Sequence, residues 1–255
     1  MRRREKFVIV AVLLSLCLLG IQYVSLDWRY LAIGIFSILT YLFSAFALSE
    51  DLQRHEWLTI LPFPVLYGTA VALFYFLLPE SVISRVSITA LFGVGMYALL
   101  LTANIYSVAK GRNIQLLYAA QAVGLFFTLL TSLLFSNTIF SLKLPFYGNG
   151  LLIGLVHFPV ILMSLWSTTL EEKVSRQVWW FSSLLTLVLV EFAVLVSFLP
   201  MPVWNLSLFI MAMMYIGLGV MQSFLRGRLF QRTINEYTLV GILVFALFLI
   251  LFPLK

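Results

Sequence analysis

Residues 178–199 read VWWFSSLLTLVLVEFAVLVSFL and contain one charged side chain, that of Glu191. As a helix, these residues would be about 33 Å long, which is enough to cross a bilayer core of about 30 Å. Apolar and polar residues do not alternate along the stretch, so the strands of a membrane barrel are excluded. A helix remains, because a backbone in lipid must satisfy its own hydrogen bonds. The stretch therefore predicts a transmembrane helix.

The rest of the chain has the same character. Of its 255 residues 62% are hydrophobic and 10% charged, and the mean hydropathy is +1.06. A soluble domain has about 25% charged residues, so lipid is the solvent that this composition suits. We expect an all-α, polytopic transmembrane bundle that forms one domain over residues 1–255, with about nine spans and eight as the alternative. The expected spans are 7–25, 30–48, 59–78, 86–108, 114–135, 150–169, 178–199, 203–224 and 237–253.

The basic residues predict the orientation of the spans. If the N-terminus is cytoplasmic, 12 of the 16 Lys and Arg residues fall in inner segments. An excess of this kind in short loops sets topology, and here it favours nine spans over eight. The net charge of +6 is then explained by topology and anionic lipid, and nucleic-acid binding is not needed. We expect a multi-pass protein of the cell membrane, in the inner membrane of a bacterium. The four outer basic residues are Arg29, Arg85, Lys143 and Lys255.

The N-terminus has some features of a cleaved signal peptide, because Met1 to Lys6 is basic and an apolar run follows. That run, 7–24, is longer than the usual apolar region of about 7–15 residues, and no small-x-small cleavage site follows it. We therefore expect a retained first span. The single cysteine, Cys17, and the two histidines have no metal-ligand spacing.

Two ionisable residues lie inside predicted spans and form the candidate site. Glu191 lies about 12 Å, and His157 about 10 Å, from the outer end of its span. The two spans are neighbours in the sequence, so the residues could meet at one depth. Intramembrane ionisable residues are usually functional, and we hypothesise a protonatable pair. The alternative is a carboxylic acid bonded to a hydroxyl and a histidine bonded separately to a backbone carbonyl.

A second polar cluster is predicted near the inner ends of the fourth and fifth spans, from Asn104, Tyr118 and Gln121. Such side chains commonly join helices for about 0.6 kcal/mol each, so a structural role is favoured. Small residues at four-residue spacing, as in Gly150-x-x-x-Gly154, predict close helix packing. The charged segment 49–57 is expected to form an interfacial surface, with a pair between Glu50 and Arg54.

The sequence contains no motif for nucleotide binding, hydrolase or metalloprotease chemistry. The outer face offers Asp27 and Glu80 as its acids, which is few for a membrane transferase. We therefore predict no catalytic residues, metal or cofactor, and the sequence does not favour an enzyme.

Two similarities remain. The stretches 76–112 and 198–228 both run from an outer proline turn to an inner basic-Gly-basic turn, so spans 3–5 and 7–9 could be parallel repeats. In addition, MYALLLTANIY (96–106), IQLLYAA (114–120) and LPF (144–146) resemble an uncharacterised family of bacterial multi-span membrane proteins. The resemblance covers most of the chain and implies a bacterial origin without implying an activity.

Three functions stay open on the sequence alone. A small-solute or ion transporter would use Glu191 and His157 in a wet cavity. A non-enzymatic scaffold or assembly factor, with a membrane protein partner, would satisfy Glu191 within the bundle. An enzyme acting on a lipid-linked substrate would need a lateral groove, and it is the least favoured because catalytic groups are missing.

Overall fold

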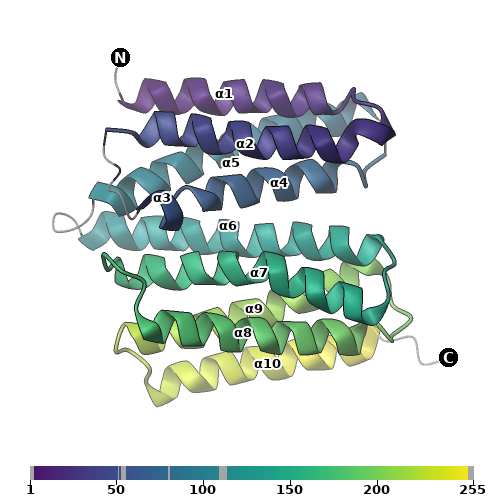
Figure 1. Cartoon of the computed structure of the whole chain (residues 1–255). Helices are drawn as coiled ribbons and strands as arrows, with labels where there is room; N and C mark the ends of the chain where they lie inside the picture. Colours follow the sequence, from purple (N-terminus) through teal and green to yellow (C-terminus); the bar gives the residue numbers. More distant parts are fainter. Residues whose placement is uncertain (1–2, 51, 53–55, 80, 109–113, 252–255) are drawn as a thin grey trace. The chain divides into compact units, whose positions relative to one another are not determined.

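The computed structural model describes residues 3–50, 52, 56–79, 81–108 and 114–251 (Figure 1). All regular elements in this part of the chain are helices, and eight of them are long and apolar enough to cross a membrane. This confirms the predicted all-α membrane bundle. The long helices are α1 (Arg3–Ile21), α2 (Arg29–Leu48), α4 (Pro62–Tyr75), α5 (Val82–Val108), α6 (Ile114–Ser141), α7 (Phe146–Thr169), α8 (Arg176–Val196), α9 (Val203–Leu225) and α10 (Gln231–Leu251).

The helix α1 accounts for the difference between eight and nine. Its 19 residues are about 28 Å long, close to the thickness of a bilayer core. Its first turn contains Arg4, Glu5 and Lys6, so its uncharged part is limited to residues 7–21. A ninth span through α1 stays a prediction.

The chain divides into two compact units, an N-terminal unit (Met1–Phe127) and a C-terminal unit (Thr128–Lys255). In the N-terminal unit α1 packs on α2 and α5, and α2 packs on α4. In the C-terminal unit α7 packs on α8 and α9, and α10 packs on α9. Within each unit, successive long helices run in opposite directions (Figure 1). The boundary falls inside the continuous helix α6.

The predicted repeat stays a prediction, because the inner turn 109–113 lies outside the described residues.

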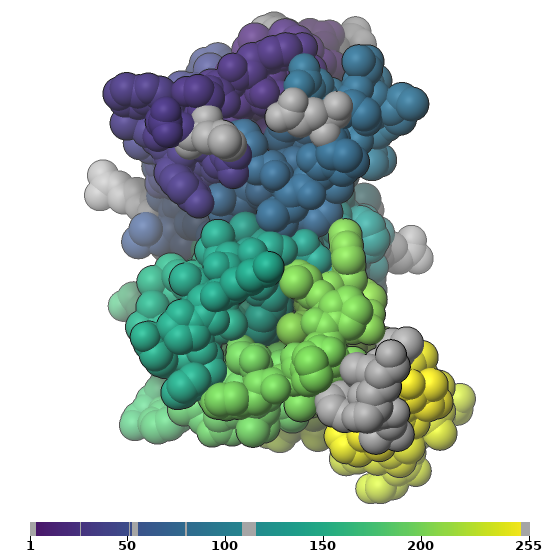
Figure 2. All heavy atoms as spheres, turned by 90° about the vertical axis from the view of Figure 1, so that its right-hand side faces the viewer, coloured from purple at the N-terminus to yellow at the C-terminus, as the bar shows by residue number. Residues whose placement is uncertain are grey.

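The connection of α1 to α2 includes the short helix η1 (Leu26–Trp28). In the end view of Figure 2 this connection, in purple, lies at the same end of the N-terminal unit as the start of α5, in blue.

Most helix ends lie within a few residues of the predicted ones, but α6 continues six residues beyond the predicted end, to Ser141. The added turn contains Ser136, Asn137 and Thr138, which are 0%, 3% and 8% exposed. These side chains are buried in protein instead of facing lipid, so their polarity does not end the helix. Hydropathy alone cannot distinguish a buried polar turn from a loop.

The start of the third predicted span is broken. A short helix, α3 (Glu56–Thr59), precedes α4, which begins at Pro62. Pro62 and Pro64 have no N–H group to donate, and proline is tolerated in the first helical turn, where those groups lack intrahelical partners. The two prolines thus account for the separate start of α4.

The predicted close packing at small residues is confirmed between α7 and α8. A Cβ atom added to Gly154 would lie 2.9 Å from Cγ2 of Val190, and one added to Gly150 would lie 2.8 Å from Cγ2 of Val194. Both distances are shorter than real Cβ contacts, so glycine is what allows these helices to approach.

Candidate functional site

His157 occupies the middle of α7 and is 1% exposed. Its Nδ1 atom lies 2.9 Å from the carbonyl oxygen of Ile153, and its Nε2 atom lies 2.8 Å from Oγ of Ser132 on α6. A carbonyl oxygen only accepts, so Nδ1 carries the proton and donates. In the neutral ring Nε2 then accepts from the Ser132 hydroxyl. The hydrogen-bond pattern thus assigns the tautomer of the imidazole.

Buried hydroxyl groups line the face of α6 that meets His157. Thr128, Ser132 and Ser136 follow one another at four-residue spacing, which places them on one side of the helix over about 12 Å. They are 2%, 1% and 0% exposed. Oγ of Ser136 lies 3.4 Å from Nε2 of His157, so two hydroxyls of this row lie within hydrogen-bond distance of the same ring nitrogen.

Two neighbouring polar groups of α6 are left without partners. Oγ1 of Thr131 and Nδ2 of Asn137 are buried and have no hydrogen bond within the described residues. A buried polar atom without a partner costs about 1–3 kcal/mol. In native proteins such atoms commonly mark a place for ordered water or an ion.

The buried face of α7 is polar at three depths. Asn149 lies eight residues before His157 and Ser164 lies seven after it, so all three share one face. Nδ2 of Asn149 donates to Oγ of Ser197 over 3.0 Å, and Nε2 of Gln222 donates to Oγ of Ser164 over 3.1 Å. Polar contacts therefore extend on both sides of His157 along the helix.

Glu191 lies elsewhere. It is on the exposed face of α8, between Leu187 and Leu195, which are 56% and 61% exposed. Within the described residues it makes no hydrogen bond or ion pair. It is five residues from the end of α8, a depth of about 8 Å. The structure thus brings His157 together with α6, and it does not hydrogen-bond His157 to Glu191.

The second predicted cluster lies in the N-terminal unit. Asn104 is half-buried, Tyr118 is exposed and Gln121 is buried, and each of the three takes part in an interaction. Close by in sequence, the hydroxyl of Tyr106 donates to the carbonyl of Ala120 over 3.0 Å. That bond ties α5 to α6 at this level, as expected of a structural role.

The sequence did not single out Glu56, which is fully buried at the start of α3. Its Oε2 atom accepts a 2.7 Å hydrogen bond from Oγ of Ser107, at the end of α5. The sequence predicts an interfacial charged surface for the segment 49–57, which includes Glu56. Its place directly before the apolar run was the one available signal for burial.

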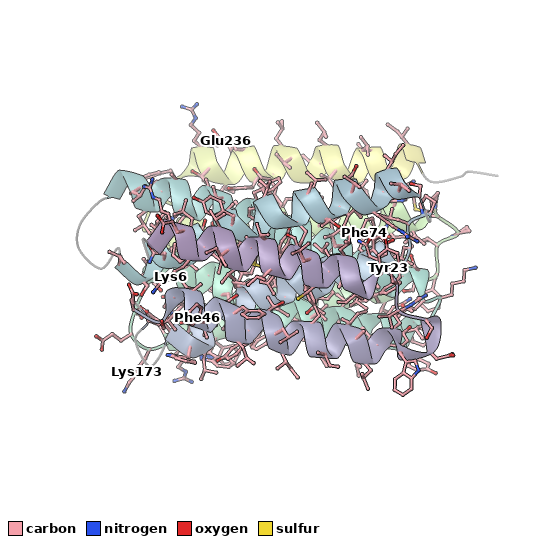
Figure 3. The ribbon with its side chains drawn as sticks, turned by 90° about the horizontal axis from the view of Figure 1, so that it is seen from above. Lys6, Tyr23, Phe46, Phe74, Lys173 and Glu236 are labelled. Carbon is pink, nitrogen blue, oxygen red and sulfur yellow. The ribbon has the colours of Figure 1, made fainter. Side chains whose placement is uncertain are left out.

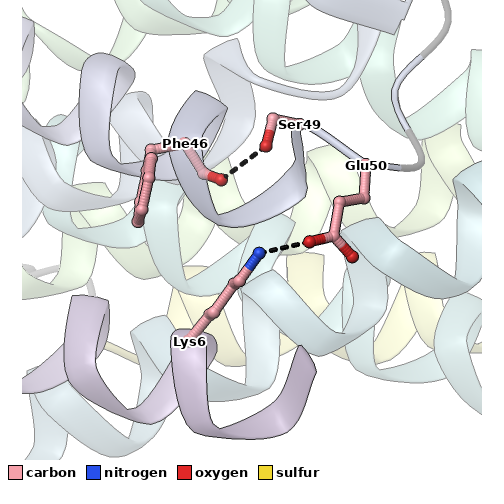
Figure 4. A network of polar contacts seen from close by, with 4 residues as sticks. All are labelled: Lys6, Phe46, Ser49 and Glu50. Carbon is pink, nitrogen blue, oxygen red and sulfur yellow. Dashed lines mark hydrogen bonds and ion pairs between the residues drawn. The ribbon is translucent and has the colours of Figure 1, made fainter. Parts of the chain in front are cut away.

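Other charges gather at the same end of the N-terminal unit. Lys6 lies in the first turn of α1, at the end of this helix opposite to Tyr23, which follows its last residue (Figure 3). Lys6 forms an ion pair with Glu50, just beyond the end of α2 (Figure 4). The predicted partner of Glu50, Arg54, lies outside the described residues.

Comparison with protein-family models, characterised proteins and solved structures finds no match to this chain. The inference of function therefore rests on the sites themselves.

Proposed function

We propose that this multi-pass membrane protein is a small-solute or ion transporter and that the polar core around His157 is its binding point. The observation that carries the proposal is the contact of the buried His157 with two hydroxyls of α6, at 2.8 and 3.4 Å. A membrane protein gains little from such a polar core by packing alone. Intramembrane ionisable groups commonly mark the path of a solute or proton.

The chemistry of the core suits a mobile proton or a hydrated ion. Nε2 of His157 can take up a proton, after which it donates to Ser132, because a hydroxyl both donates and accepts. Ser136 offers the next oxygen along α6. The buried atoms of Thr131 and Asn137 that lack partners provide further contacts for water, which a proton or ion would need at this depth.

The test is transport by the purified full chain in liposomes. A dye trapped inside reports pH while a pH gradient is imposed, and parallel samples report sodium and potassium. We expect faster flux of at least one ion than in empty vesicles. The His157→Gln variant should lose that flux, because glutamine does not titrate. Its amide oxygen can still accept a hydrogen bond from Ser132, so the variant should stay folded.

Thermal unfolding of His157→Gln in detergent serves as the control for folding. Ser183→Ala serves as the matched control for flux, because it changes an exposed polar residue of α8. Wild-type vesicles that are no leakier than empty ones for any tested ion and for a panel of small solutes would contradict transport. Full flux through a folded His157→Gln variant would contradict the role of the imidazole.

A second function, that of a scaffold or assembly factor, is favoured by Glu191 alone. A carboxyl group among exposed leucines is costly in lipid. A second membrane helix that brought a hydrogen-bond donor or a cation to Glu191 would remove this cost. This function therefore predicts a membrane protein partner on the exposed face of α8.

The two functions separate in one comparison of variants. If the scaffold proposal holds, Glu191→Leu should abolish co-purification of a defined partner. Glu191→Gln should weaken it, because the amide oxygen still accepts a hydrogen bond but carries no charge. Both variants should leave ion flux unchanged. Glu236→Gln, which removes an exposed acid from α10, is the matched control. A partner retained by both Glu191 variants would contradict the scaffold proposal.

A further inference from the structure

A polar cavity lies at the end of the N-terminal unit where α1 and α4 end and α2 and α5 begin. Its volume is about 350 Å³, and its walls include Gln22, Tyr23, Arg29, Tyr75, Phe76 and Arg85. In the predicted orientation this end faces the outside. The cavity belongs to the N-terminal unit, whereas the His157 core belongs to the C-terminal unit.

Gln22 is the most unusual wall residue. It is 8% exposed, and neither Nε2 nor Oε1 has a hydrogen-bond partner within the described residues. A buried amide group with no hydrogen-bond partner for either polar atom destabilises the folded protein, unless a ligand or water forms those bonds. Gln22 therefore offers a donor and an acceptor to whatever occupies the cavity.

The two arginines are held by aromatic rings. The guanidinium carbon of Arg29 lies 4.2 Å from the centre of the Phe76 ring, and that of Arg85 lies 4.9 Å from the centre of the Tyr23 ring. Cation–π contact at these distances orients the two guanidinium groups. The Arg85 side chain also forms hydrogen bonds with the side chains of Tyr23 and Tyr75. The Nε atoms of both arginines are buried and have no partner within the described residues.

The charges in this cavity have one sign. The described residues of its wall include two arginines and no acid. Topology does not explain the pair, because basic residues favour inner segments in short loops. Arg29 and Arg85 are two of the four outer basic residues of the chain, and they share one cavity. An anion that accepts several N–H bonds would offset both charges.

We infer that this cavity binds a phosphate group. Guanidinium groups match phosphate oxygens with paired hydrogen bonds, and two of them on one anion bind more tightly than point charges. The Nε2 group of Gln22 adds a donor, and its Oε1 atom can accept from a hydroxyl next to the phosphate. The phosphate belongs either to a phospholipid headgroup at the membrane surface or to a free ion.

The experiment uses the purified full chain in a neutral detergent free of phosphate. Binding of inorganic phosphate and of dihexanoyl-phosphatidylglycerol is measured by intrinsic fluorescence, with sodium chloride matching the ionic strength. We expect at least one probe to bind, and Arg29→Gln or Arg85→Gln to raise its Kd about tenfold or more, which corresponds to about 1.4 kcal/mol. Binding of the lipid alone assigns a headgroup, and binding of both assigns phosphate itself.

Two further variants make the test decisive if an arginine variant fails to fold. Lys143→Gln removes an outer basic residue that does not line the cavity, and it should leave the Kd unchanged. Gln22→Leu should raise the melting temperature of the unliganded protein, because it removes an unsatisfied amide, and yet weaken probe binding. An amide with a merely structural role would show the opposite change in melting temperature.

Three results would overturn the inference. The first is a wild type that binds neither probe. The second is an equal loss of binding in Lys143→Gln, which would indicate general surface charge. The third is binding that develops only in Glu80→Gln, which would mean that a carboxylate of the chain itself occupies the cavity; Glu80 lies outside the described residues.

Discussion

The hydroxyl of Ser107 donates a 2.7 Å hydrogen bond to Oε2 of Glu56, although 51 positions separate the two residues. Glu56 is fully buried, and Ser107 is 7% exposed. The bond joins the end of α5 to the short helix before α4. It therefore fixes two chain segments of the N-terminal unit at the end that we expect to face the cytoplasm.

Removal of this donor should destabilise the protein. Ser107→Ala leaves a buried carboxylate with one hydrogen bond fewer, and we expect the free energy of unfolding to fall by about 1–3 kcal/mol. Unfolding in mixed detergent micelles measures the change. Ser107→Thr keeps the hydroxyl and should lose less.

Ser49→Ala is the matched control for that change. Its hydroxyl is exposed and bonds to the carbonyl of Phe46 over 2.9 Å (Figure 4). A surface bond of this kind contributes little, so the variant should stay within about 0.5 kcal/mol of the wild type. If Ser107→Ala were equally neutral, the burial of Glu56 would have another basis.

The contact between Gly154 and Val190 gives a second prediction. Gly154→Ala would place a methyl group 2.9 Å from Cγ2 of Val190, and overpacking of this kind costs about 1–3 kcal/mol. Val190→Ala in the same chain should recover part of the loss, since it makes room for the methyl group. The measurement is the unfolding free energy of the two single variants and the double variant.

Gly34→Ala is the control for the glycine series. A Cβ atom at Gly34 meets nothing within 4 Å, and the residue lies inside α2. Alanine should there stabilise the helix by about 0.5–1 kcal/mol, because it restricts the unfolded chain. Equal effects at Gly34 and Gly154 would show that helix propensity, and not packing, dominates.

The sequence predicted the helices better than it predicted the site, for a physical reason. A span is a local property, since about 20 apolar residues identify it, and the predicted ends of α2 and α9 lie within one residue of the observed ones. Which face of a helix is buried depends on packing between helices. Hydropathy therefore placed Glu191 at a depth without revealing that it lies on the exposed face of α8.

The polar core was missed for a related reason. His157 attracted notice as an ionisable residue, but Ser132 and Ser136 are ordinary residues for a membrane helix and carry no signal on their own. Their four-residue spacing was visible in the sequence. The packing of α7 against that face of α6 was not visible in the sequence, because it joins residues 21 to 25 positions apart in the chain.

The shared contact of Ser132 and Ser136 with His157 predicts redundancy. In Ser132→Ala the hydroxyl of Ser136, 3.4 Å from Nε2, can move closer and replace the lost donor. We therefore expect each single alanine variant to lose less than about 1 kcal/mol of unfolding free energy and the double variant to lose about 1–3 kcal/mol. This is the non-additivity expected of residues in one network.

The same double variant bears on function. With both hydroxyls removed, Nε2 of His157 loses its two hydroxyl partners on α6, and we expect ion flux in liposomes to fall, as we expect for His157→Gln. Ser141→Ala is the control, because that hydroxyl bonds the carbonyl of Asn137 in its own helix. A double variant with wild-type flux would separate the hydroxyl row from the path of transport.

Glu191 provides the most direct test of the hypothesis of a Glu–His pair. On the exposed face of α8 its carboxyl group makes no hydrogen bond or ion pair within the described residues. Glu191→Gln and Glu191→Leu should therefore unfold at free energies within about 0.5 kcal/mol of each other in detergent. If Glu191→Leu instead lost about 3–5 kcal/mol, as removal of one partner from a buried ion pair does, Glu191 would have a charged partner inside the protein, as the hypothesis of a Glu–His pair requires.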